Sequence, residues 1–210
     1  MPVETLRHFG KRAVWIRALD LLLRFQSRHG KIEEPPVPID EIVAFLGFYL
    51  VFDDLFALLD LKGYLGCTKI EDREIYIDKS LVDDPKRQGQ ANFTIAHEVG
   101  HIWLHRGIPC PHLIPTDEEP WLERQADWFA SYLLMPLGLL NRVWGATFGE
   151  PGPLVITPDM EEIGIANLGS RAKLLSYLAD KRAGELAPLF TVSREAMRIQ
   201  LQDFGLLPRW

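Results

Sequence analysis

The chain has 210 residues, of which 47% are hydrophobic and 25% charged, and this ordinary globular composition excludes a disordered chain, a collagen-like repeat and a disulfide-stabilised miniprotein. The formal net charge of -6 argues against a positively charged nucleic-acid surface spread over the whole molecule. Two cysteines, no apolar run of roughly 20 residues and no apolar secretory signal at the N-terminus together predict a soluble, cytoplasmic protein that does not span a membrane.

The first predicted element is a basic amphipathic helix. Apolar residues recur at three- and four-residue intervals over residues 6–23, the period of a helix with one buried face, and Gly30 is expected to end it. Residues 1–31 carry a net charge of +5, against -11 for the remainder. We expect this helix to pack on the core with its basic face in solvent. A surface for an acidic partner and an organelle transit peptide are the alternatives, and the internal Asp20 argues against the transit peptide.

A short helix and three strands are predicted next. Asp40 is expected to cap a helix that stops at Gly47, and residues 48–52 have the pattern of a strand. Residues 64–70 and 74–78 form two further candidate strands joined by a polar turn, which predicts a half-buried hairpin.

The second half of the chain is predicted to be helical. One helix covers residues 92–105, and another begins near Pro120 and ends at Met135-Pro136. Residues 145–158 are rich in Gly and Pro and form the best candidate boundary. Beyond it, Ser193 can cap a last helix over residues 194–203.

One helix carries a pattern with clear chemistry, since residues 97–101 have the sequence His-Glu-Val-Gly-His. Positions i and i+4 share a helix face, so His97 and His101 can point two imidazole nitrogens at one zinc ion. Glu98 lies about one hundred degrees round the helix, where its carboxylate can act as a general base without occupying a metal position. Because a chain with this many histidines shows the pattern by chance in roughly one case in a hundred, the motif needs support from its context.

The next helix supplies that context. Glu123 and Asp127 are again i and i+4, so their carboxylates share one face. Glu123 can complete a His2Glu site for one zinc ion per chain, and Mn2+ also fits such ligands. Asp127 can accept a hydrogen bond from the far nitrogen of a ligand imidazole. Carboxylates that stood alone would indicate only a solvated helix face, but beside the histidine pair they predict a centre for metal-assisted hydrolysis with Glu98 as catalytic base.

Other polar residues are expected to have lesser roles. His105 lies about 12 Å along the helix axis from His97, so a helix-end polar contact or a substrate contact is expected rather than ligation. Cys110 and His112 are expected to be a buried thiol and a surface imidazole. The tryptophans of the two helices and Phe129 are expected to pack the helices together. The candidates for stabilising the oxyanion of the reaction stay open: His105, Tyr64, Tyr76, His112 and several arginines.

In both of these predicted helices, the candidate ligands are part of a longer sequence motif. Residues 93–101 followed by Leu104-His105 resemble the F-T-x-A-H-E-x-G-H…L-H signature of the ImmA/IrrE metallopeptidases. Residues 123–136 are similar to the second motif of that family, which often has Asn in place of Asp127. Residues 186–197 are similar to the helix-turn-helix-like segment that often follows the catalytic part.

The resemblance implies a fold class and a domain organisation. It implies an α+β, mostly helical zincin-like peptidase domain with a small antiparallel sheet, followed by a short helical tail. We expect the peptidase domain over residues 1–144, a linker over residues 145–165 and a helix-turn-helix-like domain over residues 166–210.

The resemblance also implies the ligands and base that the spacing indicates, and a substrate class. Members of the family cut transcriptional repressors of the helix-turn-helix (Xre) type to relieve repression. The alternatives are a non-proteolytic metal-binding regulator that sequesters a repressor and a toxin-like component of a two-gene module. Residues 185–210 carry three arginines and three acids, and this net charge of zero argues against direct DNA binding.

Overall fold

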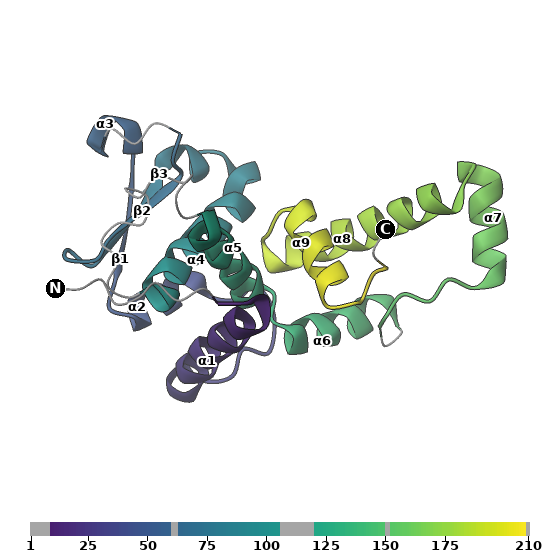
Figure 1. Cartoon of the computed structure of the whole chain (residues 1–210), viewed down its shortest axis with the longest axis horizontal. Helices are drawn as coiled ribbons and strands as arrows, with labels where there is room; N and C mark the ends of the chain where they lie inside the picture. The colour runs from purple at the N-terminus through teal and green to yellow at the C-terminus, as the bar shows by residue number, and fades with distance from the viewer. Residues whose placement is uncertain (1–8, 60–62, 106–119, 150–151, 209–210) are drawn as a thin grey trace. The chain divides into compact units, whose positions relative to one another are not determined.

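The chain folds into two compact units that are each mostly helical, and a small sheet in the first unit makes the fold α+β, as predicted (Figure 1). The first unit comprises Met1–Ile32 and Val37–Leu134, and the second comprises Glu33–Pro36 and Met135–Trp210. The computed structural model describes residues 9–59, 63–105, 120–149 and 152–208.

The boundary between the two compact units lies at Leu134–Met135, because the helix over residues 137–148 groups with the C-terminal helices. The segment 145–165, predicted as a linker, contains the end of that helix and the first turns of the next. The functional division into a peptidase domain and a helix-turn-helix-like domain stays a prediction.

The helices and strands have the following bounds. In the first unit they are α1 (Lys11–His29), α2 (Ile39–Phe45), β1 (Tyr49–Asp53), α3 (Leu55–Leu59), β2 (Gly66–Lys69), β3 (Glu74–Asp78), η1 (Lys79–Leu81), η2 (Pro85–Arg87), α4 (Gln88–Leu104) and α5 (Pro120–Leu134). In the second unit they are α6 (Leu137–Phe148), α7 (Pro158–Leu168), α8 (Arg171–Phe190) and α9 (Arg194–Asp203).

Helix α1 packs on the core as expected, but with a different face. Its buried side chains are Val14, Ala18, Leu21, Leu22 and Phe25. Three apolar residues that the periodicity placed on the buried face are exposed instead, and these are Ile16, Leu19 and Leu23. The helix has apolar residues on two faces, and contact with α5 decides which face is buried.

Of the two predicted helix caps, one is observed and the other is not. Ser193 caps α9 as predicted, because its Oγ accepts a hydrogen bond from the backbone N–H of Ala196 at 3.1 Å. Asp40 does not cap α2, since the N-cap position is Pro38 and Asp40 lies in the first turn. A carboxylate there still stabilises the positive end of the helix dipole.

The three strands form a mixed sheet in the order β1-β3-β2. Strands β2 and β3 are antiparallel, as the predicted hairpin requires, with Cys67 opposite Tyr76. Strand β1 runs parallel to β3, with Val51 opposite Tyr76. The sequence analysis predicted an antiparallel sheet, and the parallel strand β1 makes this prediction wrong for that strand. Hydrophobic periodicity carries no information about the direction of β1.

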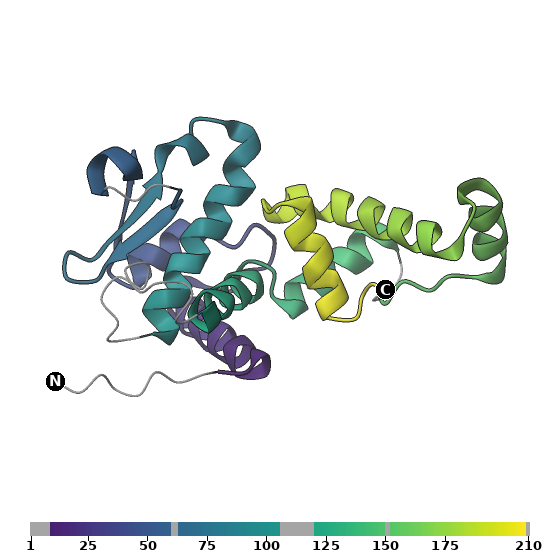
Figure 2. The same cartoon turned by 45° about the horizontal axis from the view of Figure 1, so that its top comes forward.

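The two faces of the sheet bury different residues. Side chains alternate along a strand, so Gly66 and Thr68 face helix α4, while Cys67 and Tyr76 face Leu55 on the opposite side. Figure 2 shows the sheet on one side of α4 and helices α1 and α5 on the other. Helix α4 is thus enclosed between the edge strand β2 and helix α5.

The second unit is built around helix α8. Helices α7 and α9 both pack against it. The buried core of the second unit includes Trp144, Phe190, Met197 and Leu201. Among the helices that the structure describes, none is long and apolar enough to cross a membrane.

Candidate metal centre

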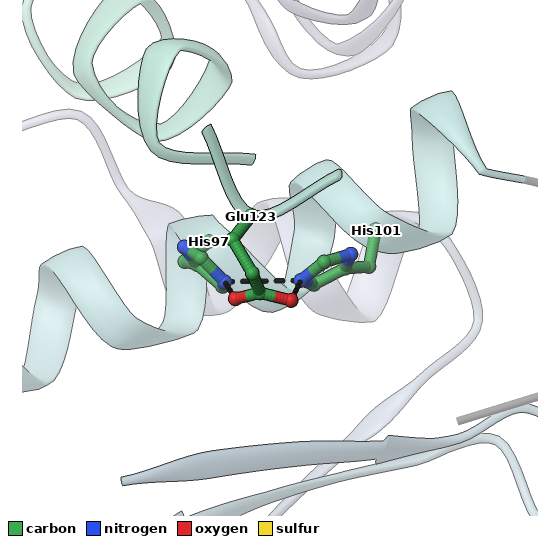
Figure 3. A group of neighbouring side chains, drawn as sticks. All are labelled: His97, His101 and Glu123. Carbon is green, nitrogen blue, oxygen red and sulfur yellow. Dashed lines mark hydrogen bonds and ion pairs between the residues drawn. The ribbon is translucent and has the colours of Figure 1, made fainter. Parts of the chain in front are cut away.

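Helices α4 and α5 bring the three predicted ligands together. His97 and His101 lie one turn apart on α4, and Glu123 lies in the first turn of α5. Figure 3 shows the three side chains pointing toward one another. The two Nε2 atoms are 3.0 Å apart, and the carboxylate oxygens of Glu123 lie 3.1 Å from His97 Nε2 and 3.4 Å from His101 Nε2. Each of the three residues therefore offers a ligand atom within 4.8 Å of the others.

The chemistry of these atoms fits a divalent cation. His97 Nδ1 lies 2.9 Å from Asp127 Oδ1, and a carboxylate accepts, so Nδ1 carries the proton and neutral His97 presents a lone pair on Nε2. The centre thus collects two imidazole nitrogens and a carboxylate, the donor set of catalytic zinc sites. Ligands about 2.0–2.1 Å from a tetrahedral zinc ion lie about 3.3 Å from one another, close to the spacing observed.

In the metal-free centre, a proton on His97 supplies the positive charge. Burial disfavours the charged form of His97, but hydrogen bonds to Asp127 and Glu123 outweigh it and raise the pKa of His97 to about 10. Burial lowers the pKa of His101. Burial would raise the pKa of Glu123, yet its close contacts with the rings of His101 and His97 bring the pKa well below the usual range. The metal-free centre therefore holds an ion pair between His97 and Glu123.

This ion pair predicts a pH dependence of the metal-free fold. The folded state raises the pKa of His97 from 6.5 to about 10, so its contribution to stability is complete below pH 6.5 and is lost as the pH rises through 10. Thermal midpoints of the chelator-treated protein should fall over this interval. His97→Asn protein should show a flatter profile there, and equal slopes for the two proteins would contradict the assignment.

The predicted base, Glu98, is held beneath the edge strand β2. It is only 1% exposed, and the hydroxyl of Thr68 donates a hydrogen bond of 2.8 Å to its Oε2. Gly66 leaves space for the carboxylate, since a Cβ at this position would lie 2.8 Å from Glu98 Oε1 and 2.7 Å from Thr94 Cγ2. In the described part of the chain, the ligand group is formed without Glu98, as its predicted role requires.

The close approach of α4 and α5 depends on Gly100. A Cβ at this position would lie 3.1 Å from Ala126 Cα and 3.3 Å from Phe129 Cβ. Phe129 is fully buried at this crossing, which confirms its predicted packing role. The helix spacing in turn sets the distance between the histidine pair and Glu123.

Replacing Gly100 with alanine is expected to weaken metal binding. The added methyl group meets backbone atoms of α5, so the two helices must move apart by a few tenths of an ångström and carry Glu123 away from His97. Overpacking of this kind costs about 1–3 kcal/mol in stability. Gly145 lies on a different helix, and a Cβ added there would meet no atom within 4 Å, so Gly145→Ala is the matched control. Zinc affinity and the free energy of unfolding measured for both variants test this expectation, and equal losses would contradict it.

Four of the other residues singled out in the sequence have different outcomes. His105 makes the helix-end polar contact that was expected, at 3.0 Å between its Nδ1 and His101 Nδ1. Tyr76, a candidate for the oxyanion, lies on the face of the sheet away from α4, and its hydroxyl donates to Glu74 at 2.6 Å, which raises the pKa of Tyr76 to about 12. Cys110 and His112 lie outside the described residues.

The residues that support the centre were not predicted from the sequence. Thr68 could have been found from strand alternation, because it shares a strand face with Gly66. Gln125 is 1% exposed and contacts His105, yet it lies two residues after Glu123, a spacing that indicates no shared helix face.

Comparison with known families supports the resemblance. Residues 69–148 match the family model described as the IrrE N-terminal-like domain, Peptidase_M78, a metallopeptidase family. This region includes β3, α4 and α5, and thus all three residues of the centre. No match was found among curated proteins. The matched segment indicates a peptidase, and specifically a metallopeptidase.

Proposed function

We propose that the protein is a cytoplasmic zinc-dependent endopeptidase that cleaves a helix-turn-helix repressor of the Xre type. The observation that carries the proposal is the convergence of His97, His101 and Glu123 beside the buried carboxylate of Glu98. The family match over residues 69–148 supports peptidase chemistry at this centre.

The chain's own residues supply the proton transfers of peptide hydrolysis. His97, His101 and Glu123 would hold a divalent cation, which would supply Lewis acidity for the hydrolysis. Glu98 accepts one proton from the attacking water as the new C–O bond forms, and delivers it to the amine nitrogen as the C–N bond breaks. The hydroxyl of Thr68 fixes the orientation of the Glu98 carboxylate through Oε2.

The repressor substrate is inferred from the resemblance to the ImmA/IrrE metallopeptidases. The test is to incubate the zinc-loaded protein with a purified candidate repressor of the helix-turn-helix type and to analyse the products by mass spectrometry. We expect two fragments from one cleavage, and none after treatment with a chelator. A stable complex with the intact repressor in size-exclusion chromatography would instead indicate a regulator that sequesters its partner.

Replacing Thr68 with valine is expected to lower the rate of cleavage about tenfold while zinc stays bound. Valine has the same shape but cannot donate to the buried carboxylate of Glu98, and an unsatisfied buried group costs about 1–3 kcal/mol. Thr68→Ser keeps a hydroxyl and is the matched control. A loss of activity shared by both variants would show that packing, and not the hydrogen bond, is what matters at this position.

A further inference from the structure

A line of hydrogen bonds leads from the outer nitrogen of His101 to the N-terminal segment of the chain. His101 Nδ1 lies 3.0 Å from His105 Nδ1, and His105 Nε2 lies 3.1 Å from Gln125 Oε1. The amide nitrogen of Gln125 then donates to the backbone carbonyl of Phe9 at 3.2 Å. His101, His105 and Gln125 are 2%, 5% and 1% exposed, so water does not compete for these bonds.

The backbone carbonyl fixes the direction of every bond in this line. A carbonyl oxygen only accepts, so the NH2 group of Gln125 faces Phe9 and its Oε1 faces His105. Oε1 also only accepts, so His105 Nε2 carries a proton. Buried His105 has no anionic partner among the hydrogen bonds of the described structure, and burial favours its neutral form, so its Nδ1 is an acceptor. His101 must then donate from Nδ1, which leaves a lone pair on Nε2, the nitrogen that lies 3.0 Å from His97 Nε2 and faces the position of a cation.

We propose that His105 and Gln125 form a positioning relay that sets the tautomer and ring orientation of His101, with the Phe9 carbonyl as its fixed end. The inference rests on the proposed function only in treating His101 as a metal ligand. Neither relay residue is assigned a contact with substrate. The relay does for His101 what Asp127 does for His97, but with a neutral acceptor in place of a carboxylate.

His105 and Phe9 each make a further contact that holds the relay in place. The ring of His105 lies edge-on to the indole of Trp121, with centroids 6.3 Å apart and planes at 88°. The guanidinium of Arg17 on α1 lies 4.0 Å from the centre of the Phe9 ring. The orientation of His101 is therefore tied to helix α1 as well as to helices α4 and α5.

Two substitutions at position 105 separate the relay from simple packing. Asparagine places its Oδ1 two bonds from Cβ, as histidine places Nδ1, so H105N can still accept from His101. Glutamine places its polar atoms three bonds from Cβ, as histidine places Nε2, so H105Q can reach Gln125 but leaves His101 without its acceptor. Loss of such an outer partner costs about 10–100-fold in metal affinity.

Zinc affinity is measured by competition with a chromophoric chelator. We expect H105Q to bind zinc about 10–100-fold more weakly than the wild type, and H105N to stay within about threefold of it. His29, which ends helix α1 and contacts the carbonyl of Phe25, provides the control as His29→Asn, with unchanged affinity expected. If H105N lost as much affinity as H105Q, the relay would be wrong.

The second measurement needs neither metal nor activity. Nitrogen-15 NMR of the metal-free protein reports which ring nitrogen of each neutral histidine carries the proton. We expect His101 protonated on Nδ1 and His105 on Nε2, and we expect Gln125→Met to yield mixed tautomers for both. A proton on Nε2 of His101 in the wild type would overturn the relay. A wild-type protein that bound no divalent metal would instead refute the proposed function, and the NMR result would still decide on the relay.

Discussion

Replacing Glu98 with glutamine is expected to lower the rate of the proposed peptide cleavage by about 10²–10⁴-fold, the range typical of a lost general acid–base catalyst, while the protein still binds zinc. The amide has the shape of the carboxylate but cannot take a proton from water near neutral pH. Its carbonyl oxygen can still accept from Thr68, so the side chain should keep its place under β2. Single-turnover cleavage rates and the metal content of the purified variant measure the two quantities.

The matched control for this variant is Glu74→Gln. Glu74 is a carboxylate on strand β3. Its side chain accepts a hydrogen bond from Tyr76, a residue on the face of the sheet away from α4. The control should cleave at the wild-type rate. Full activity of the Glu98 variant would remove Glu98 from the reaction, and loss of its zinc would assign Glu98 to the metal site instead.

The convergence of His97, His101 and Glu123 was predictable because the main spacings are local. His97 and His101 are one helical turn apart, and so are Glu123 and Asp127, so the sequence alone places each pair on one face. The packing of α4 on α5 then needs only the close crossing at Gly100 to bring the two faces together.

The residues that support the centre are joined across long stretches of sequence. Thr68 and Glu98 are 30 positions apart, and Gln125 and Phe9 are 116 positions apart. No periodicity connects such positions, since only the tertiary fold brings them into contact. For the same reason, the sequence predicts a helix-end contact for His105 but does not predict which groups its two ring nitrogens contact.

The sequence predicts five of the helices, α1, α2, α4, α5 and α9, together with the three strands. It does not predict α3, α6, α7 and α8 individually, and it says less about how the elements associate. Gly and Pro after residue 148 mark where α6 ends, but they do not show that α6 packs with the C-terminal helices. Likewise, the pattern of residues 48–52 indicates a strand, while its parallel pairing with β3 depends on the path of the chain between them.

Replacing Glu123 with glutamine is expected to lower zinc affinity by about a thousandfold. Zinc binds protein sites with about 10–16 kcal/mol, so one of three protein ligands accounts for roughly 4 kcal/mol, and each 1.4 kcal/mol is about tenfold. Glutamine also removes the only negative charge within the ligand group His97, His101 and Glu123 found among the described residues. Chelator competition and metal analysis measure the loss.

The stability of the protein gives an independent measure of the same site. A ligand at about 1,000 times its dissociation constant stabilises the folded state by about 4 kcal/mol, so zinc should raise the thermal midpoint of the wild type and change that of the Glu123 variant only slightly. Asp127→Asn, which alters the partner of His97 but no ligand, should lose only about 10–100-fold in affinity. The Glu123 variant should lose more zinc affinity than the Asp127 variant, because Glu123 would contact the cation directly and Asp127 only through His97. Wild-type affinity in the Glu123 variant would show that its carboxylate is not a ligand, and the three-residue centre would then be wrong.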